Sequence, residues 1–381
     1  MKLVTLTSAA FILALARLAA TAHEVDFKHL HGSTNPATPL QIVAETSGPV
    51  AAPAPMKEAV PTSGHGFWKF AAAKELMPTP PETQPFLKGA HGTIIVDAER
   101  DLVYWGLEKV GWVAFSNKLT QSWVVKGDPK FATGNLHGAD IFPRKSLLGN
   151  KLPLVVAADN VEGEVYLSDT TFQKAQILGR PGGPYKGKAA FMPTDAAFID
   201  ENDIYVTDGY GSQWFMHATT KPLEYDGTFI GGKEFSRTPH GITKSPGKET
   251  LLIAARPEAI IKEYLYKKDK WLDSMGLPAG STVCDVDVWG DYALAPCLDG
   301  PKGADGKGAK GPIYIVNLKK KTIASIIRVK EDLGYEAADH IHDAAWYVRG
   351  KGRNREVYIL FTNWNPGGIG AIKLVNAPDT K

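Results

Sequence analysis

The chain has 381 residues, of which 44% are hydrophobic and 22% charged, an ordinary composition for a protein with one large or two smaller folded domains. Lys2 and Arg17 fall within the first 22 positions, so the remainder carries 41 of the 43 basic residues against 41 acidic ones. This balance argues against nucleic acid or an anionic membrane as a partner, and 38 glycines with 26 prolines favour turns over long helices.

Residues 1–22 are predicted to be a secretory signal peptide. Lys2 supplies a positive start, "SAAFILALA" a short apolar run, and the Ala-Thr-Ala sequence that ends at Ala22 a small-residue cleavage pattern. Arg17 interrupts the apolar run, which is therefore too short to span a bilayer. We expect a secreted or periplasmic protein that has no membrane-spanning segment.

Residues 23–85 form a lead-in rich in Pro, Ala, Thr and Ser, for which we expect no core of its own. Its segment "GHGFWKFAA" (64–72) could supply a strand to the last unit of the fold. The folded domain is predicted to span residues 86–381.

Short segments of similar sequence recur from residue 90 onward at spacings of 44 to 58 residues. They are "AHGTIIVD" (90–97), "LHGADIF" (136–142), "PTDAAFID" (193–200), "PHGITKS" (239–245), "VCDVDVWG" (283–290) and "IHDAAWYV" (341–348). Each is followed by a second apolar strand that ends in a polar turn, then by a third strand, and often by a more polar fourth strand. The sequence therefore predicts an all-β fold, a six-bladed β-propeller with four-stranded antiparallel blades.

The second residue of each segment is expected near one mouth of the central channel. His137, His240 and His342 fall on alternate blades, so three imidazoles would converge and leave a fourth position open, as in catalytic zinc sites. The alternative is three hydrogen-bonded structural histidines. His91, on the first blade, breaks the threefold pattern and is expected to be a hydrogen-bonding residue at the mouth.

One aspartate and one pair of cysteines are further candidate site residues. Asp343, with backbone carbonyls of neighbouring inner strands, would suit calcium, or its carboxylate could accept hydrogen bonds from backbone amides. Cys284 begins the inner strand of the fifth repeat and Cys297 ends its second strand, so an exported chain could join them by a disulfide. Two unpaired cysteines are the alternative.

The stretch "FMPTDAAFIDENDIYVTDGYGSQ" (191–213), followed by "PHGI", a strand that ends in arginine and then "HD", resembles the lyase domain of peptidylglycine α-amidating enzymes. That domain is a six-bladed propeller of the NHL type that cleaves peptidyl-α-hydroxyglycine into a peptide amide and glyoxylate. The resemblance covers roughly residues 133–376 and implies a zinc-dependent carbon–nitrogen lyase.

The resemblance implies roles for individual residues. The zinc ligands would be His137, His240 and His342, and a structural calcium would use Asp343 and the carbonyl of Ala139. Tyr210, in the "DGY" turn, would be the catalytic base, and Arg256, in "AARPE", would clamp the substrate's carboxylate. Tyr210 could instead cap a turn, and Arg256 could pair with Glu258.

The chain departs from the family beside this site. The family's essential arginine early in the first blade has no counterpart, and His91 or Trp105 occupies that region. His340 replaces the methionine two residues before the last zinc ligand. We therefore expect the metal site to be kept and the substrate to differ.

Two other functions remain open from the sequence. The first is a calcium-dependent hydrolase of the lactonase and paraoxonase type, whose ligands could come from Asp195, Asp285, Asp287 and Asn363. The second is an exported binding propeller whose metal is structural. In each case we expect a monomer whose partner is a small molecule or a peptide.

Overall fold

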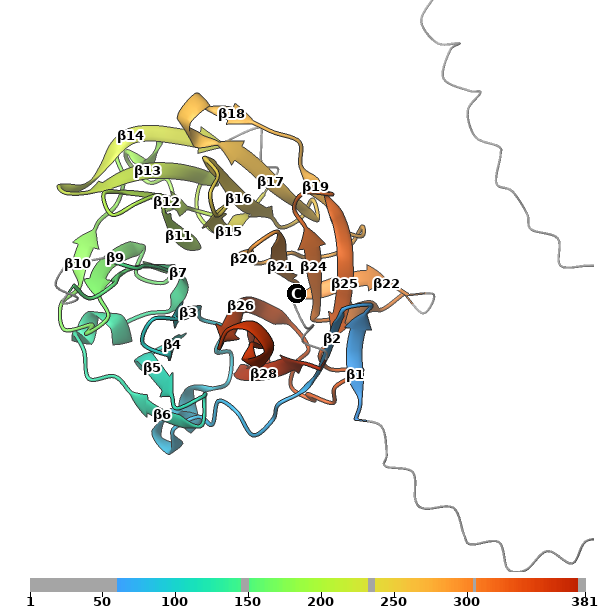
Figure 1. The fold of residues 1–381 in the computed structure, drawn as a ribbon. Helices are drawn as coiled ribbons and strands as arrows, with labels where there is room; N and C mark the ends of the chain where they lie inside the picture. The colour runs from blue at the N-terminus through green and yellow to red at the C-terminus, as the bar shows by residue number, and fades with distance from the viewer. Residues whose placement is uncertain (1–59, 145–150, 232–236, 304–305, 376–381) are drawn as a thin grey trace, which may run out of the picture. The chain divides into compact units, whose positions relative to one another are not determined.

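The computed structural model describes residues 60–144, 151–231, 237–303 and 306–375 (Figure 1). The expected signal peptide and the first part of the lead-in lie outside the described residues. Within the described ranges, no helix is both long enough and apolar enough to cross a bilayer.

Six antiparallel sheets stand around a central axis, which confirms the predicted all-β, six-bladed propeller (Figure 1). Blade 1 consists of β3 (Ile94–Asp97), β4 (Leu102–Leu107), β5 (Gly111–Ser116) and β6 (Gln121–Val124). Blade 2 consists of β7 (Leu136–Phe142), β8 (Leu154–Asp159), β9 (Glu164–Asp169) and β10 (Gln176–Leu178). Blade 3 consists of β11 (Asp195–Phe198), β12 (Asp203–Thr207), β13 (Trp214–Thr220) and β14 (Leu223–Gly231).

The second half of the ring carries the additions to the regular pattern. Blade 4 consists of β15 (Pro239–Lys244), β16 (Thr250–Ala255), β17 (Ile260–Leu265) and β18 (Lys270–Trp271), and β19 (Met275–Gly276) also pairs with β17. Blade 5 consists of β20 (Asp287–Trp289), β21 (Tyr292–Pro296), β24 (Pro312–Asn317) and β25 (Thr322–Arg328), with an inserted hairpin of β22 (Asp299–Lys302) and β23 (Gly308–Lys310). Blade 6 consists of β26 (Ile341–Arg349), β27 (Glu356–Asn363), β28 (Gly368–Leu374), β2 (Trp68–Ala72) and β1 (Thr62–His65). Short 3-10 helices span Pro81–Phe86, Pro129–Ala132, Gly183–Tyr185, Tyr266–Lys268 and Gly352–Asn354.

The N-terminal strands complete blade 6. Phe70 of β2 lies opposite Leu374 of β28, so the first and last described strands share one sheet (Figure 1). Burial along β2 alternates because a strand presents successive side chains to opposite faces: Trp68 and Phe70 are buried while Lys69 is exposed. The outermost strand, β1, is held against blade 5, where Ser325 Oγ accepts a hydrogen bond from the backbone N–H of His65.

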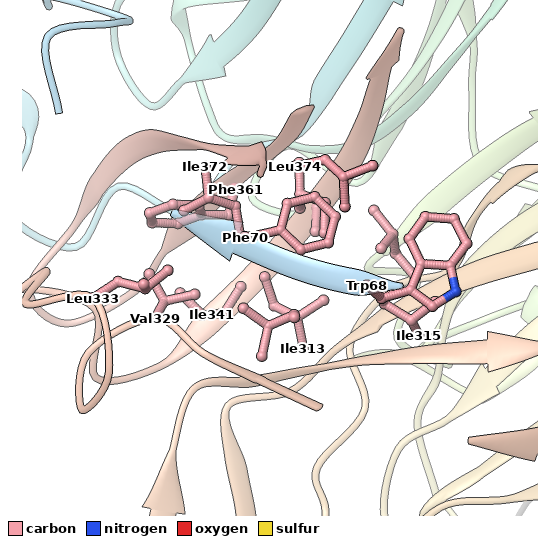
Figure 2. Packing of buried hydrophobic residues seen from close by; sticks show 14 of the residues in the cluster. Trp68, Phe70, Ile313, Ile315, Val329, Leu333, Ile341, Phe361, Ile372 and Leu374 are labelled. Atoms are coloured by element: carbon pink, nitrogen blue, oxygen red, sulfur yellow. The ribbon is translucent and has the colours of Figure 1, made fainter. Parts of the chain in front are cut away.

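The two aromatic side chains of β2 pack between blade 6, to which β2 belongs, and blade 5. Figure 2 shows Trp68 and Phe70 within a buried apolar cluster between blades 5 and 6. The other labelled members of this cluster are Ile313, Ile315, Val329, Leu333, Ile341, Phe361, Ile372 and Leu374. Ring closure therefore depends on hydrophobic burial as well as on strand pairing.

Aspartates on the inner strands tie blade 2 to blade 3, blade 3 to blade 4, blade 5 to blade 6 and blade 6 to blade 1. Asp140 accepts a hydrogen bond from the backbone N–H of Phe198 at 2.9 Å. The same contact recurs from Asp195 to Ile242, from Asp287 to Trp346 and from Asp343 to Ile94, at 2.6 to 2.7 Å. Each carboxylate satisfies an inner-strand amide of the next blade, which keeps the inner ends of the blades in fixed register.

Candidate metal centre

The three histidines on alternate blades lie where the inner strands are irregular. The register with the neighbouring strand shifts at His137 on β7, around His240 on β15 and at His342 on β26. A bulge adds an unpaired residue and re-aims its side chain. All three side chains are buried, at 2 to 3% exposure. The bulges thus explain how residues of hydrogen-bonded strands bring their imidazoles together.

The four histidines that head a repeat converge at one place. The ring centres of His137 and His342 lie 4.5 Å apart, and His240 lies 4.8 Å from the first and 5.0 Å from the second. His91 lies 5.3 Å from His137 and 4.9 Å from His342. The ligand atoms of His91, His137 and His342 all lie within 4.8 Å of one another, so this triad could hold a metal ion.

Hydrogen bonds set the tautomers of three of these rings. Nδ1 of His137 donates to the carbonyl of Thr194 at 2.7 Å, and Nδ1 of His240 donates to the carbonyl of Cys284. Nδ1 of His91 donates to the carbonyl of Gly89 at 2.6 Å. A ring whose Nδ1 carries the proton keeps the lone pair on Nε2 for a ligand, as is usual for metal-binding histidines.

Burial keeps these imidazoles neutral. It lowers the pKa of His137, His240 and His342 well below the usual value, and the neighbouring histidines and the cation of Arg256 lower it further. The pKa of His91 is also lowered, again chiefly by burial. Neutral imidazole is the form that binds metal.

The two unpaired ring nitrogens of His342 indicate whether these residues fit a metal ion. Both of its ring nitrogens are buried, and neither has a hydrogen-bond partner among the described residues. A buried polar atom without a partner costs about 1 to 3 kcal/mol. A soft-to-borderline divalent cation would satisfy Nε2 and would suit imidazole ligands, so the donor set fits zinc or a related metal.

Tyr210 and Arg256 complete the site, and the "DGY" turn that follows β12 places Tyr210 there. The Tyr210 hydroxyl lies 3.2 Å from Nε2 of His137 and 3.0 Å from Nε2 of His240, and it accepts a hydrogen bond from Nη1 of Arg256 at 3.1 Å. Nη2 of Arg256 contacts Nε2 of His240 and donates to Cys284 Sγ. Burial raises the pKa of Tyr210, and the Arg256 cation opposes that shift. None of these hydrogen bonds of Arg256 runs to a carboxylate.

His91 and His340 differ in their place at the mouth. Nδ2 of Asn135 lies 3.3 Å from Nε2 of His91, and Asn135 also donates to Asn160 at 3.1 Å. The ring of His91 lies 6.1 Å from that of Trp364, which is 38% exposed. His340 contacts the other part of the rim: its ring lies 5.9 Å from Trp364, and its Nε2 lies 3.8 Å from Asp299.

The threefold pattern predicts a hydrogen-bonding role for His91 at the mouth, and the structure places this histidine beside His137 and His342. The signal was present, because "AHG" repeats the "LHG" and "PHG" of the second and fourth repeats. Asn135, which contacts the His91 ring, was missed altogether because a single asparagine before a strand carries no pattern.

A channel cavity of about 400 Å³ extends from the histidines along the inner strands. Ala139, Asp195, Asp285 and Asp343 line it. Asp343 accepts the hydrogen bond from Ile94 described above, and burial raises its pKa to about 7. Burial also raises the pKa of Asp195 and Asp285 well above the usual value, and the neighbouring aspartates contribute to these shifts.

The glycine after the histidine makes space for these aspartates. A Cβ atom on Gly138 would lie 2.4 Å from Oδ1 of Asp195, and one on Gly241 would lie 2.4 Å from Oδ1 of Asp285. The "HG" pairs of blades 2 and 4 are therefore required by close packing against the next blade. Asn363, another candidate calcium ligand, donates through Nδ2 to the carbonyls of Ala337 and Pro366.

The expected disulfide is wrong: Cys284 and Cys297 are free thiols. The residue opposite Cys297 is Val283, so Cys284 is offset by one position. Such an offset places two side chains on opposite faces of a sheet. Cys297 packs in the apolar cluster between blades 4 and 5, and Cys284 Sγ contacts Arg256 in the site.

Comparison with known proteins shows no family. No family model and no curated protein matches the chain. Among solved structures, the chain is similar to that of U3-55K, with 10% identity, 77% of this chain and 82% of that chain covered, and a TM-score of 0.49. It is also similar to the hydrazine synthase of Kuenenia stuttgartiensis, with 12% identity, 55% and 53% covered, and a TM-score of 0.38. Likenesses this distant carry no argument about function.

Proposed function

We propose that the protein is an exported, zinc-dependent lyase that cleaves the C–N bond of an α-hydroxyglycine-type substrate to give an amide and glyoxylate. The supporting observation is that the Tyr210 hydroxyl lies within hydrogen-bond distance of two histidine Nε2 atoms and of Arg256 at once. A proton acceptor, a buried cation and metal-ligand nitrogens thus meet at one point. Histidines of the cluster would hold the zinc, with His137, His240 and His342 as the set that the resemblance implies.

Each residue has a chemical task in this proposal. Zinc, when bound, supplies Lewis acidity that lowers the pKa of a hydroxyl group in contact with it. Arg256 binds the substrate's carboxylate, and its Nε, which is buried and without a hydrogen-bond partner, is available for that contact. The Arg256 cation offsets part of the rise in the pKa of Tyr210 that burial causes, and Tyr210, as the phenolate, takes the proton of the substrate's hydroxyl.

The proton balance closes within the site. As the hydroxyl loses its proton to Tyr210 Oη, the carbon–oxygen double bond of glyoxylate forms and the C–N bond breaks. The leaving amide nitrogen then takes the proton back from Tyr210. No oxidant or reductant is needed, and the base returns to its starting state.

Two further parts of the proposal concern the channel and the setting. A calcium ion bound by Asp343 and the carbonyl of Ala139 would neutralise part of the buried carboxylate charge of the cavity. We propose a secreted or periplasmic monomer that acts on a peptide or small molecule, since the charges give no basis for nucleic acid or membrane binding.

The test combines metal analysis with an activity assay. The purified protein is analysed for zinc and calcium and then incubated with a synthetic peptidyl-α-hydroxyglycine while glyoxylate is measured. Tyr210→Phe is expected to lower turnover by about 10²- to 10⁴-fold, the usual contribution of a general base. Tyr266→Phe, at the outer edge of blade 4, is the matched control and is expected to retain turnover. Zinc without glyoxylate would discard the reaction, and calcium alone would favour the hydrolase.

A further inference from the structure

His91 is the histidine that the threefold pattern leaves over. It stands on blade 1, opposite His240 on blade 4, while His137 and His342 stand on the blades that flank blade 1. The metal-compatible triad of the structure contains His91, because its ligand atoms lie within 4.8 Å of those of His137 and His342. A site built from the three histidines on alternate blades alone does not account for this placement.

The distances between the rings fit a shared ion. An imidazole bound through nitrogen at about 2.1 Å places its ring centre roughly 3.2 Å from the metal, so neighbouring ligand rings lie about 4.5 to 5.2 Å apart in octahedral or tetrahedral shells. The two pairs that involve His91 measure 4.9 and 5.3 Å. The three pairs among His137, His240 and His342 measure 4.5 to 5.0 Å.

The hydrogen bonds of His91 match those of the other rings. Its Nδ1 donates to the Gly89 carbonyl, as the Nδ1 atoms of His137 and His240 donate to backbone carbonyls, so its Nε2 also carries a lone pair. The contact of that lone pair is the amide of Asn135 at 3.3 Å, a long hydrogen bond that an ion could replace. The unpartnered nitrogens of His342 lie beside it.

We infer that His91 is a protein ligand and that its imidazole, with those of His137 and His342 from blades 2 and 6, holds one metal ion. His240 stands outside this set, because its Nε2 is contacted by Nη2 of Arg256 and by the Tyr210 hydroxyl. This rests on the metal centre of the proposed function but does not depend on the reaction. Three imidazoles leave at least one coordination position open to a substrate, and they suit cobalt(II), nickel(II) or iron(II) as well as zinc, while calcium should bind poorly.

The test measures binding of the metal alone, by titrating zinc and cobalt(II) into the metal-free full chain. His91→Gln is expected to weaken zinc binding by at least about 10-fold, the lower end of what even an indirect ligand partner contributes. It is also expected to change the visible absorption of bound cobalt, which reports the ligand set. His342→Gln serves as the positive control, and His65→Gln, an exposed histidine on β1, as the matched negative control.

Three results would overturn the inference: His91→Gln with unchanged zinc affinity and an unchanged cobalt spectrum, wild-type protein that binds neither metal, or weakened binding matched equally by His65→Gln. Thermal unfolding of each metal-free variant shows whether the fold is intact. Because these readouts involve no substrate, a failure of the lyase assay leaves this result standing. Unchanged zinc binding by His91→Gln would overturn the role of His91 and leave the proposed lyase standing, whereas wild-type protein that binds no metal would overturn both.

Discussion

Phe70→Ala tests how the ring is closed. The Phe70 side chain has 0% exposure and belongs to the buried apolar cluster between blades 5 and 6, which also contains Ile313, Phe361 and Ile372 (Figure 2). Loss of a fully buried phenylalanine costs about 3 to 5 kcal/mol through lost transfer free energy and the cavity that remains. For a protein of this size the expected fall in Tm is about 2 °C per kcal/mol, or roughly 6 to 10 °C.

Phe67→Ala is the matched control, because Phe67 lies three positions earlier and is 39% exposed. We expect its free energy of unfolding to fall by less than about 1 kcal/mol. Urea unfolding followed by tryptophan fluorescence compares the two, since Trp68 lies in the same cluster. Equal stability of the two variants would show that the packing of β2 between the blades does not hold the ring together.

Three further predictions concern the channel and the site. Gly138→Ala should lose about 1 to 3 kcal/mol of unfolding free energy, because its Cβ would overlap Asp195, whereas Gly179→Ala, with open space around it, should not; thermal melts of both variants decide this. Burial raises the pKa of Asp140 to about 6, so its contribution to stability is present below pH 4 and is lost as the pH rises to about 6. Asp140→Asn should remove this pH-dependent loss of unfolding free energy. We expect the loss to be only about 1 to 2 kcal/mol, because the carboxylate faces a cavity that water can enter. Urea unfolding at pH 4 and pH 7 would contradict this if the wild type and the variant lost equal stability. Tyr210→Phe should leave zinc binding within about threefold of the wild type while lowering turnover by about 10²- to 10⁴-fold, because Tyr210 is assigned to proton transfer. Zinc titration would refute this assignment if the affinity fell together with the activity.

The fold could be predicted because a propeller repeats itself. Each blade buries both faces against its neighbours, so similar inner strands recur at nearly constant spacing and the number of blades follows from counting. The strands added to this repeating pattern could not be predicted in the same way. The fifth strand of blade 6 and the hairpin β22–β23 arise from local sequence that occurs once, and nothing in a single copy shows which edge it joins.

The candidate site was predictable in its residue types and less so in its exact contacts. His137, His240 and His342 meet as alternation around a ring requires. The register at Cys284 could not be read from the sequence, because a shift of one residue reverses the face to which a side chain points. The place of His91 beside the other three rings could not be read from the threefold pattern either, because strict alternation around the ring includes no residue of blade 1.

The pairing of β2 with β28 has a consequence for biosynthesis. Residues 68–72 leave the ribosome about three hundred positions before the strand at 368–374 with which they pair. A nascent or truncated chain that stops short of Gly368 therefore exposes two sheet edges and the apolar face of Trp68 and Phe70, a combination that invites aggregation. Only a chain that extends through Leu374 can hide them, so residues 368–374 must be synthesised before the last blade can assemble.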